Sequence, residues 1–136
     1  MPAMFTFRRS RSVLLAIGVA AASLGVAVTA QAPASRSVRE GVYTAAQAAR
    51  VGALYQEKCS NCHAARMWGQ DWPEKSVFDV YDTIKNFMPE DAPGSLSERQ
   101  TRDVVAYILK VNKLPAGKTE LPAADAELRQ IRLALP

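Results

Sequence analysis

The stretch YQEKCSNCH (residues 55–63) contains both cysteines and the only histidine of this 136-residue chain. The three residues fall within five consecutive positions, from Cys59 to His63. Two cysteines this close together can form a disulfide, act as a redox pair, bind a metal or attach a cofactor. The adjacent histidine is the residue that separates these possibilities.

Cys59 and Cys62, followed directly by His63, form the C-x-x-C-H pattern that attaches c-type haem. Two thiols at this spacing, at the end of a helix, can each form a thioether bond with one of the two vinyl groups on one edge of the macrocycle. The next residue then lies under the iron, where its imidazole provides the proximal nitrogen ligand. The pattern predicts one covalently bound haem c, attached at Cys59 and Cys62, with His63 as an iron ligand.

Three other interpretations explain these residues less well. A structural zinc site takes four cysteine or histidine ligands as a rule, and the whole chain has only three such residues. A thioredoxin-like cysteine pair belongs to a fold built on a sheet, and the sequence has no strand-like alternation long enough to build one. A plain disulfide between Cys59 and Cys62 leaves His63 unexplained.

The first thirty residues have the features of an export signal. Arg8, Arg9 and Arg11 precede an uncharged, alanine-rich run over residues 13–30 that ends in small residues. These features predict a secretory signal peptide over residues 1–30 and a periplasmic location for the remainder. The alternative is an uncleaved membrane anchor, because the run is close to the ~20 apolar residues that span a bilayer.

The basic character of the chain comes mostly from the predicted signal. The full chain has seventeen basic and thirteen acidic residues, and three of the basic ones lie in residues 1–30. Fourteen basic and thirteen acidic residues remain, a net charge of +1. A chain this close to neutral has no nucleic-acid-binding surface, so no nucleic-acid partner is expected. Membrane contact is expected only if the signal is retained.

The sixth iron position is predicted to be filled by a methionine. Met1 and Met4 leave with the signal, and Met67 lies only four residues after His63, a reach of at most about 14 Å, too short to pass around the macrocycle. Met88 follows twenty-five residues after His63, in a proline-containing loop, and is the predicted second iron ligand. Its thioether sulfur would raise the reduction potential relative to a bis-histidine site. The alternative is a core methionine that fills a gap.

The exported part of the chain is predicted to be all-α. Apolar residues recur at helical spacing in three segments, which predicts helices over residues 45–58, 77–87 and 98–112. The expected N-caps are Thr44, Ser76 and Ser97, the last with Gln100 in a capping box. The positions expected to face the core are Ala48, Val51, Ala53 and Tyr55, then Val77, Val80, Tyr81 and Ile84, then Val104, Tyr107, Ile108 and Val111.

These patterns divide the chain into four parts. They are a signal peptide (residues 1–30), a flexible leader without periodicity (31–43), the haem domain (44–121) and a C-terminal extension (122–136). The extension is expected to contain a short helix, with Leu128, Ile131 and Leu135 packed against the domain.

Taken together, these residues resemble the class I cytochrome c family, in particular the small exported mono-haem cytochromes of bacteria. The likeness covers residues 41–121, through the stretches GVYTAAQAARVGALYQEKCSNCH, FMPEDAPGSLS and VVAYILKVNKLPAG. It implies a fold in which the first and last helices of the domain cross around the haem, with Tyr55 and Tyr107 at their contact. It also implies that His63 and Met88 lie on opposite faces of the haem.

The sequence departs from the family pattern at two places. Family members often carry glycine eight residues before the first haem cysteine, where the helices touch. Here that position is Val51, with Gly52 one place later, which implies a wider helix crossing. The Gly-Pro-x-Leu run after the haem histidine is also missing. Pro73 is the expected substitute, whose carbonyl would accept the imidazole N–H of His63.

The resemblance implies an electron carrier without substrate chemistry of its own. Trp68, Trp72, Tyr81 and Phe87 are expected to wall the haem pocket. The expected partners are a periplasmic dehydrogenase as donor and a terminal oxidase or another cytochrome as acceptor, each meeting the protein through a small, transient interface. Two alternatives remain open: a haem subunit docked in a dehydrogenase complex, and a gas-binding or peroxidase-like haem protein with an open sixth site.

Overall fold

The structure is a computed structural model that describes residues 35–64 and 75–134. The predictions for the signal peptide (residues 1–30), and those that involve Met67, Trp68, Trp72, Pro73 and Leu135, lie outside the described residues.

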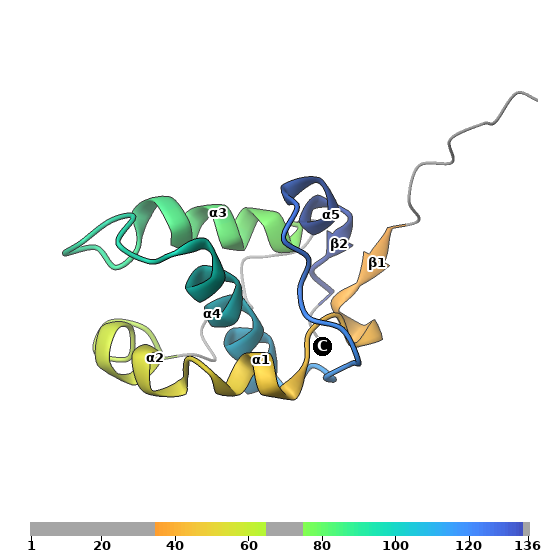
Figure 1. Ribbon diagram of the computed structural model, residues 1–136, viewed down its shortest axis with the longest axis horizontal. Coiled ribbons are helices and arrows are strands. Elements are labelled where there is room, and N and C mark those ends of the chain that lie inside the picture. Colours follow the sequence, from red (N-terminus) through yellow and green to blue (C-terminus); the bar gives the residue numbers. More distant parts are fainter. Residues whose placement is uncertain (1–34, 65–74, 135–136) are drawn as a thin grey trace, which may run out of the picture. The chain divides into compact units, whose positions relative to one another are not determined.

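Helices make up about half of the described residues and strands only four, which agrees with the predicted all-α class (Figure 1). In chain order the elements are β1 (Arg36–Ser37), the 3-10 helix η1 (Val38–Glu40), α1 (Ala45–Ala49), α2 (Gly52–Lys58), α3 (Val77–Phe87), α4 (Glu98–Val111), α5 (Asp125–Arg129) and β2 (Ile131–Arg132). None of the helices in the described ranges has the length and hydrophobicity that a membrane span requires.

Helices α3 and α4 begin where the sequence predicts. The Asp79 carboxylate accepts hydrogen bonds from the Ser76 backbone N–H at 2.7 Å and from the Ser76 hydroxyl at 2.8 Å. Ser97 and Gln100 form the predicted capping box, with reciprocal bonds of 2.9 and 3.2 Å. These side chains satisfy backbone donors that a helix N-terminus leaves without a partner. The predicted core positions of α3 are all buried, and in α4 Val104 and Ile108 are buried while Tyr107 and Val111 are half-buried.

The predicted single helix over residues 45–58 is interrupted in the structure. Thr44 caps α1 as predicted, but α1 ends at Ala49 and α2 begins at Gly52. Between them Val51 has a φ of −112° and a ψ of 7°, outside the helical range. A β-branched residue followed by glycine is a weak point in a helix. The guanidinium of the preceding Arg50 also forms an ion pair with a carboxylate of α4.

The contact that draws Arg50 to α4 is a bidentate ion pair. Two of its nitrogens donate to the carboxylate oxygens of Asp103 at 2.7 and 2.8 Å, and Asp103 is only 3% exposed. Ala53, predicted to be buried, is exposed, and Leu54 is half-buried in its place. Residues 51, 54 and 55 share one helix face, and residue 53 does not lie on it. Val51 and Tyr55 are buried as predicted.

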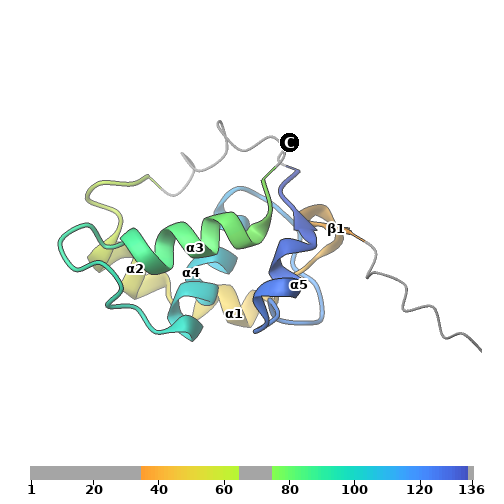
Figure 2. The same cartoon turned by 90° about the horizontal axis from the view of Figure 1, so that it is seen from above.

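Helix α4 packs against both α1 and α3, and α5 packs against α3 (Figures 1 and 2). The rings of Tyr55 and Tyr107 meet between α2 and α4, with centroids 4.8 Å apart and planes tilted by 34°. This contact confirms the pairing that the family resemblance implies. The guanidinium of Arg129 in α5 lies 3.4 Å from the ring centroid of Phe78 near the start of α3, which attaches the C-terminal extension to the domain.

The segment predicted to be a flexible leader is ordered from residue 36 onward, so that prediction is wrong for residues 36–43. Strand β1 pairs in parallel with β2, and Val38, Val42 and Tyr43 are buried. The Tyr43 hydroxyl donates to the backbone carbonyl of Leu114 at 2.8 Å. Strands of two residues have too little alternation for a sequence pattern to reveal.

The C-terminal extension packs on the domain as expected. Leu128 in α5 and Ile131 in β2 are 0% and 1% exposed. Because β2 pairs with β1, the C-terminal extension and the segment at residues 36–43 stabilise each other.

Gly41 and Gly117 allow two loop segments that are far apart in the sequence to come into contact. The backbone N–H of Gly117 donates to the carbonyl of Tyr43 at 2.7 Å, and a Cβ atom on Gly117 would overlap the carbonyl group of Gly41. Gly52 is different, because a Cβ atom there would lie 3.8 Å from Cε2 of Tyr107, an ordinary contact distance. The helix crossing at Gly52 therefore has room for a methyl group, in line with the wider crossing expected from Val51.

Replacement by alanine should have opposite effects on stability at Gly117 and at Gly52. Gly117→Ala should lower the free energy of unfolding by about 3 kcal/mol or more, because its methyl group would displace backbone. Gly52→Ala should leave it unchanged or raise it by up to about 1 kcal/mol, because alanine is the better helix former. Guanidinium unfolding followed by far-UV circular dichroism would measure both. Equal losses from both variants would contradict the contacts described here.

Candidate cofactor site

The segment Cys59 to His63 continues from the end of α2 as a compact turn. The Cys59 N–H donates to the carbonyl of Tyr55 at 2.9 Å, which extends the helical hydrogen bonding by one residue. The N–H groups of Cys62 and His63 both donate to the carbonyl of Cys59, at 3.2 and 2.9 Å. The turn therefore carries two thiols and an imidazole on a short segment whose backbone groups are bonded to one another.

A cavity of about 510 Å³ lies between this turn and the loop that follows α3. This volume is within the range of small-molecule and cofactor pockets. Tyr55, Ile84, Leu96 and Val104 give the cavity apolar walls, and all four are buried. They come from α2, α3, the loop before α4 and α4, so each of these parts of the domain contributes to the site.

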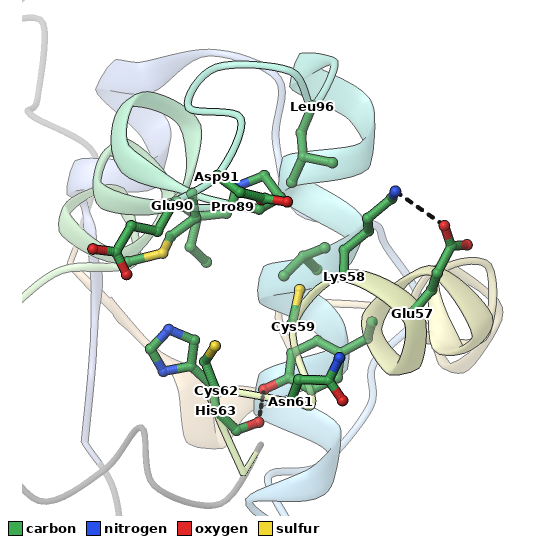
Figure 3. Close-up of a pocket in the computed structure, with 14 residues that line it drawn as sticks. Glu57, Lys58, Cys59, Asn61, Cys62, His63, Pro89, Glu90, Asp91 and Leu96 are labelled. Atoms are coloured by element: carbon green, nitrogen blue, oxygen red, sulfur yellow. Dashed lines mark hydrogen bonds and ion pairs between the residues drawn. The ribbon is translucent and has the colours of Figure 1, made fainter.

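All four predicted site residues line this one cavity. Cys59, Cys62 and His63 lie on one side, and Met88 belongs to the segment that also contributes Pro89, Glu90 and Asp91. Figure 3 shows the labelled residues of that segment across the cavity from the two cysteines and the histidine. The structure thus brings together residues that are separated by twenty-five positions in the sequence.

Met88 is held at the junction of a helix and a loop. Its N–H donates to the carbonyl of Ile84 at 3.1 Å, the last helical hydrogen bond of α3, and its own backbone is extended. Pro89, which follows it, is buried. Proline disfavours a helical conformation in the residue before it, so Pro89 ends α3 and turns the chain at Met88, as predicted.

The donor set fits a haem better than a bare metal ion. Cys59 and Cys62 are free thiols, and burial raises the pKa of the Cys59 thiol, which keeps it protonated. In residues 35–64 and 75–134, no three His, Cys, Asp or Glu side chains are grouped so that they could hold a metal ion. Two thiols beside an apolar cavity, with an imidazole on the same side and a thioether on the lining, are groups that can attach a haem covalently and ligate its iron.

The rim of the cavity is polar and carries an excess of acidic groups. Lys58 forms an ion pair with Glu57 at 3.0 Å. The hydrogen bond from Lys58 to Glu57 raises the pKa of Lys58, with a smaller contribution from Asp91. Glu90 and Asp91 are exposed on the opposite rim. Because both members of the ion pair are exposed, it contributes little to stability.

Two predictions about the pocket wall are wrong. Phe87, the last residue of α3, is 62% exposed and is not among the described residues that line the cavity. Tyr81 is buried in the core, with its ring centroid 6.2 Å from that of Phe78. The apolar lining residues Leu96 and Val104 were not assigned to the pocket from the sequence. The helical periodicity marks Val104 as a core position of its helix, and this is the sequence signal that could have identified it as a lining residue.

Comparison with known protein families matched residues 46–108 to the family described as cytochrome c oxidase, cbb3-type, subunit III. The matched residues include the attachment segment at Cys59 to His63, and Met88. Comparison with curated proteins and with solved structures gave no match. The family match, with two thiols and an imidazole beside an apolar cavity of sufficient size, identifies the class of this domain. The match identifies residues 46–108 as a domain of the c-type cytochromes, an electron-carrier family, with covalently bound haem c as its cofactor.

Proposed function

We propose that this chain is an exported mono-haem electron carrier that works in the periplasm. It would accept single electrons from a dehydrogenase or respiratory complex and pass them to a terminal oxidase or another cytochrome. The observation that carries the proposal is that Cys59, Cys62, His63 and Met88 line one cavity from two separate segments of the chain. The periplasmic location rests on the signal-like sequence of residues 1–30.

Each of the four residues has a defined part in this proposal. Cys59 and Cys62 would hold the cofactor through thioether bonds, and His63 and Met88 would ligate its iron. The bound haem supplies one-electron redox chemistry. The thioether of Met88 would favour the ferrous state as an iron ligand, and the site would exchange electrons without opening to a substrate.

The surface around the thiols suits electron exchange with another protein. Cys62 is exposed, as are Asn61, Glu90 and Asp91 on the rim of the cavity. A cofactor edge attached at Cys62 would therefore lie close to solvent. Electrons could then pass directly to a partner that covers this edge, through the small interface that transient redox complexes use.

The loop that carries Met88 is fixed at both ends, which favours permanent ligation over a lid that opens. Within the loop the N–H of Ala92 donates to the carbonyl of Pro89 at 3.0 Å, and the N–H of Ser95 donates to that of Ala92 at 3.2 Å. Lys85 near the end of α3 forms an ion pair with Glu98 at the start of α4, at 2.6 Å. This arrangement argues against the gas-binding alternative.

Replacement of Met88 tests the ligand assignment. Met88→Ala should abolish the weak far-red sulfur-to-iron absorption band of the ferric protein and allow carbon monoxide to bind the ferrous protein. Met88→His should keep six ligands and lower the reduction potential, because a second imidazole replaces the thioether. Met67→Leu is the matched control, since Met67 lies too close to His63 to reach the sixth position, and its spectrum should equal that of the unmodified protein.

Two results would contradict this assignment. Persistence of the far-red band in Met88→Ala, with its loss in Met67→Leu, would mean that the other methionine is the ligand. Rapid carbon monoxide binding to the unmodified ferrous protein at neutral pH would favour the gas-binding alternative.

Removal of the cofactor tests how far the fold depends on it. A chain with both attachment cysteines replaced by alanine, purified without haem, should be largely disordered. The apolar walls formed by Ile84, Leu96 and Val104 would lose their partner, and the 106 residues that follow the predicted signal bury only limited apolar surface without it. Far-UV circular dichroism during heating should show no cooperative transition. A sharp transition near that of the haem-containing protein would disprove the dependence.

A further inference from the structure

The side chain of Tyr55 is bonded to the last residue of the haem attachment segment. Its hydroxyl donates a hydrogen bond to the backbone carbonyl oxygen of His63, at a distance of 3.2 Å (Figure 3). The two residues are eight positions apart. The backbone carbonyl of Tyr55 also accepts hydrogen bonds from the N–H groups of Cys59 and Ser60, at 2.9 and 3.0 Å. One residue therefore contacts both the beginning and the end of the attachment segment.

The Tyr55 ring has little freedom to move. Tyr55 is 1% exposed, and its ring packs on that of Tyr107 with a centroid separation of 4.8 Å. Because Tyr107 belongs to α4, the position of the Tyr55 hydroxyl is set by the packing of α2 on α4. The hydrogen bond transmits this fixed position to the backbone of His63.

A carbonyl held in place at His63 constrains the backbone from which the imidazole extends. The carbonyl carbon and Cβ are both bonded to the Cα atom of His63, so a hydrogen bond that holds the carbonyl group limits the directions in which the Cα–Cβ bond can point. Hydrogen bonds to the residue that ligates the iron are a recognised means of tuning the reduction potential of haem proteins. Here the bond is made to the backbone of the ligand residue rather than to its ring.

We propose that Tyr55 is a positioning residue for the proximal ligand, and that its hydroxyl sets the orientation of the His63 imidazole and thereby the reduction potential. This inference rests on the proposed function, in which His63 ligates the iron. It assigns to Tyr55 a role beyond the core packing that the sequence predicts for it. The ring fills the helix contact, and the hydroxyl acts on the site.

Tyr43 provides a matched control within the same chain. It too is 1% exposed, and its hydroxyl also donates to a backbone carbonyl, that of Leu114, at 2.8 Å. Tyr43 is not among the described residues that line the cavity. Replacing either tyrosine by phenylalanine removes one buried hydroxyl and leaves the ring in place. The two variants should therefore lose similar stability, and only one of them should alter the site.

The test compares Tyr55→Phe with Tyr43→Phe in the haem-containing protein. Both should melt about 4–8 °C lower than the unmodified protein, the effect of one lost hydrogen bond in a domain of this size. Only Tyr55→Phe should broaden or split the low-spin ferric electron paramagnetic resonance signal, which depends on the orientation of the axial imidazole. It should also change the equilibrium constant for reduction at least twofold, which is about 18 mV for a one-electron couple. An unchanged signal and potential in Tyr55→Phe would overturn the proposal.

A His63→Gly variant tests the positioning role of Tyr55 separately from the assignment of His63 as an iron ligand. His63→Gly should lose the low-spin spectrum and regain it when free imidazole is added, and failure to lose it would contradict ligation by His63 itself. In His63→Gly with imidazole, the ligand is no longer attached to the chain. Adding Tyr55→Phe there should leave the resonance signal and the potential unchanged. The same change in both backgrounds would mean that Tyr55 acts by another route, and the positioning role would be wrong.

Discussion

The two proposed iron ligands come from different parts of the chain, so the fold has to hold two cavity walls at a constant separation. Helix α4 contacts residues beside both walls of the cavity. Tyr107 packs against Tyr55 beside the attachment segment, and Glu98 at the start of α4 is bonded to Lys85 near the end of α3. Because α4 also contributes Val104 to the cavity, its packing determines the width of the space between the walls.

Local features of the sequence were sufficient to predict most helix ends and to select four residues that line one cavity. Ser76 and Ser97 cap their helices through side chains three residues away, and Pro89 ends α3 through its own ring geometry. The two cysteines and the histidine are contiguous, so their spacing alone indicated a cofactor. Met88 was selected by chain reach and by its neighbouring proline, and the structure places it on the same cavity.

Features that depend on distant partners were not predictable in this way. The break between α1 and α2 accompanies the pairing of Arg50 with Asp103, fifty-three positions further along the chain. The order of residues 36–43 depends on strand β2 near the other end of the sequence. The bond from Tyr55 to His63 looked like ordinary core packing, because spacing shows which residues share a helix face but not where a hydroxyl points. The exposure of Phe87 likewise depends on where α3 stops relative to the cavity.

The parallel pairing of β1 with β2 joins a segment near the beginning of the chain to one near its end. If the chain is exported N-terminus first, as proposed, residues 36 and 37 would emerge before the two thiols, and residues 131 and 132 would emerge after them. This pairing could therefore form only after Cys59 and Cys62 had already crossed the membrane, and the thiols would be accessible while the two strands were still apart.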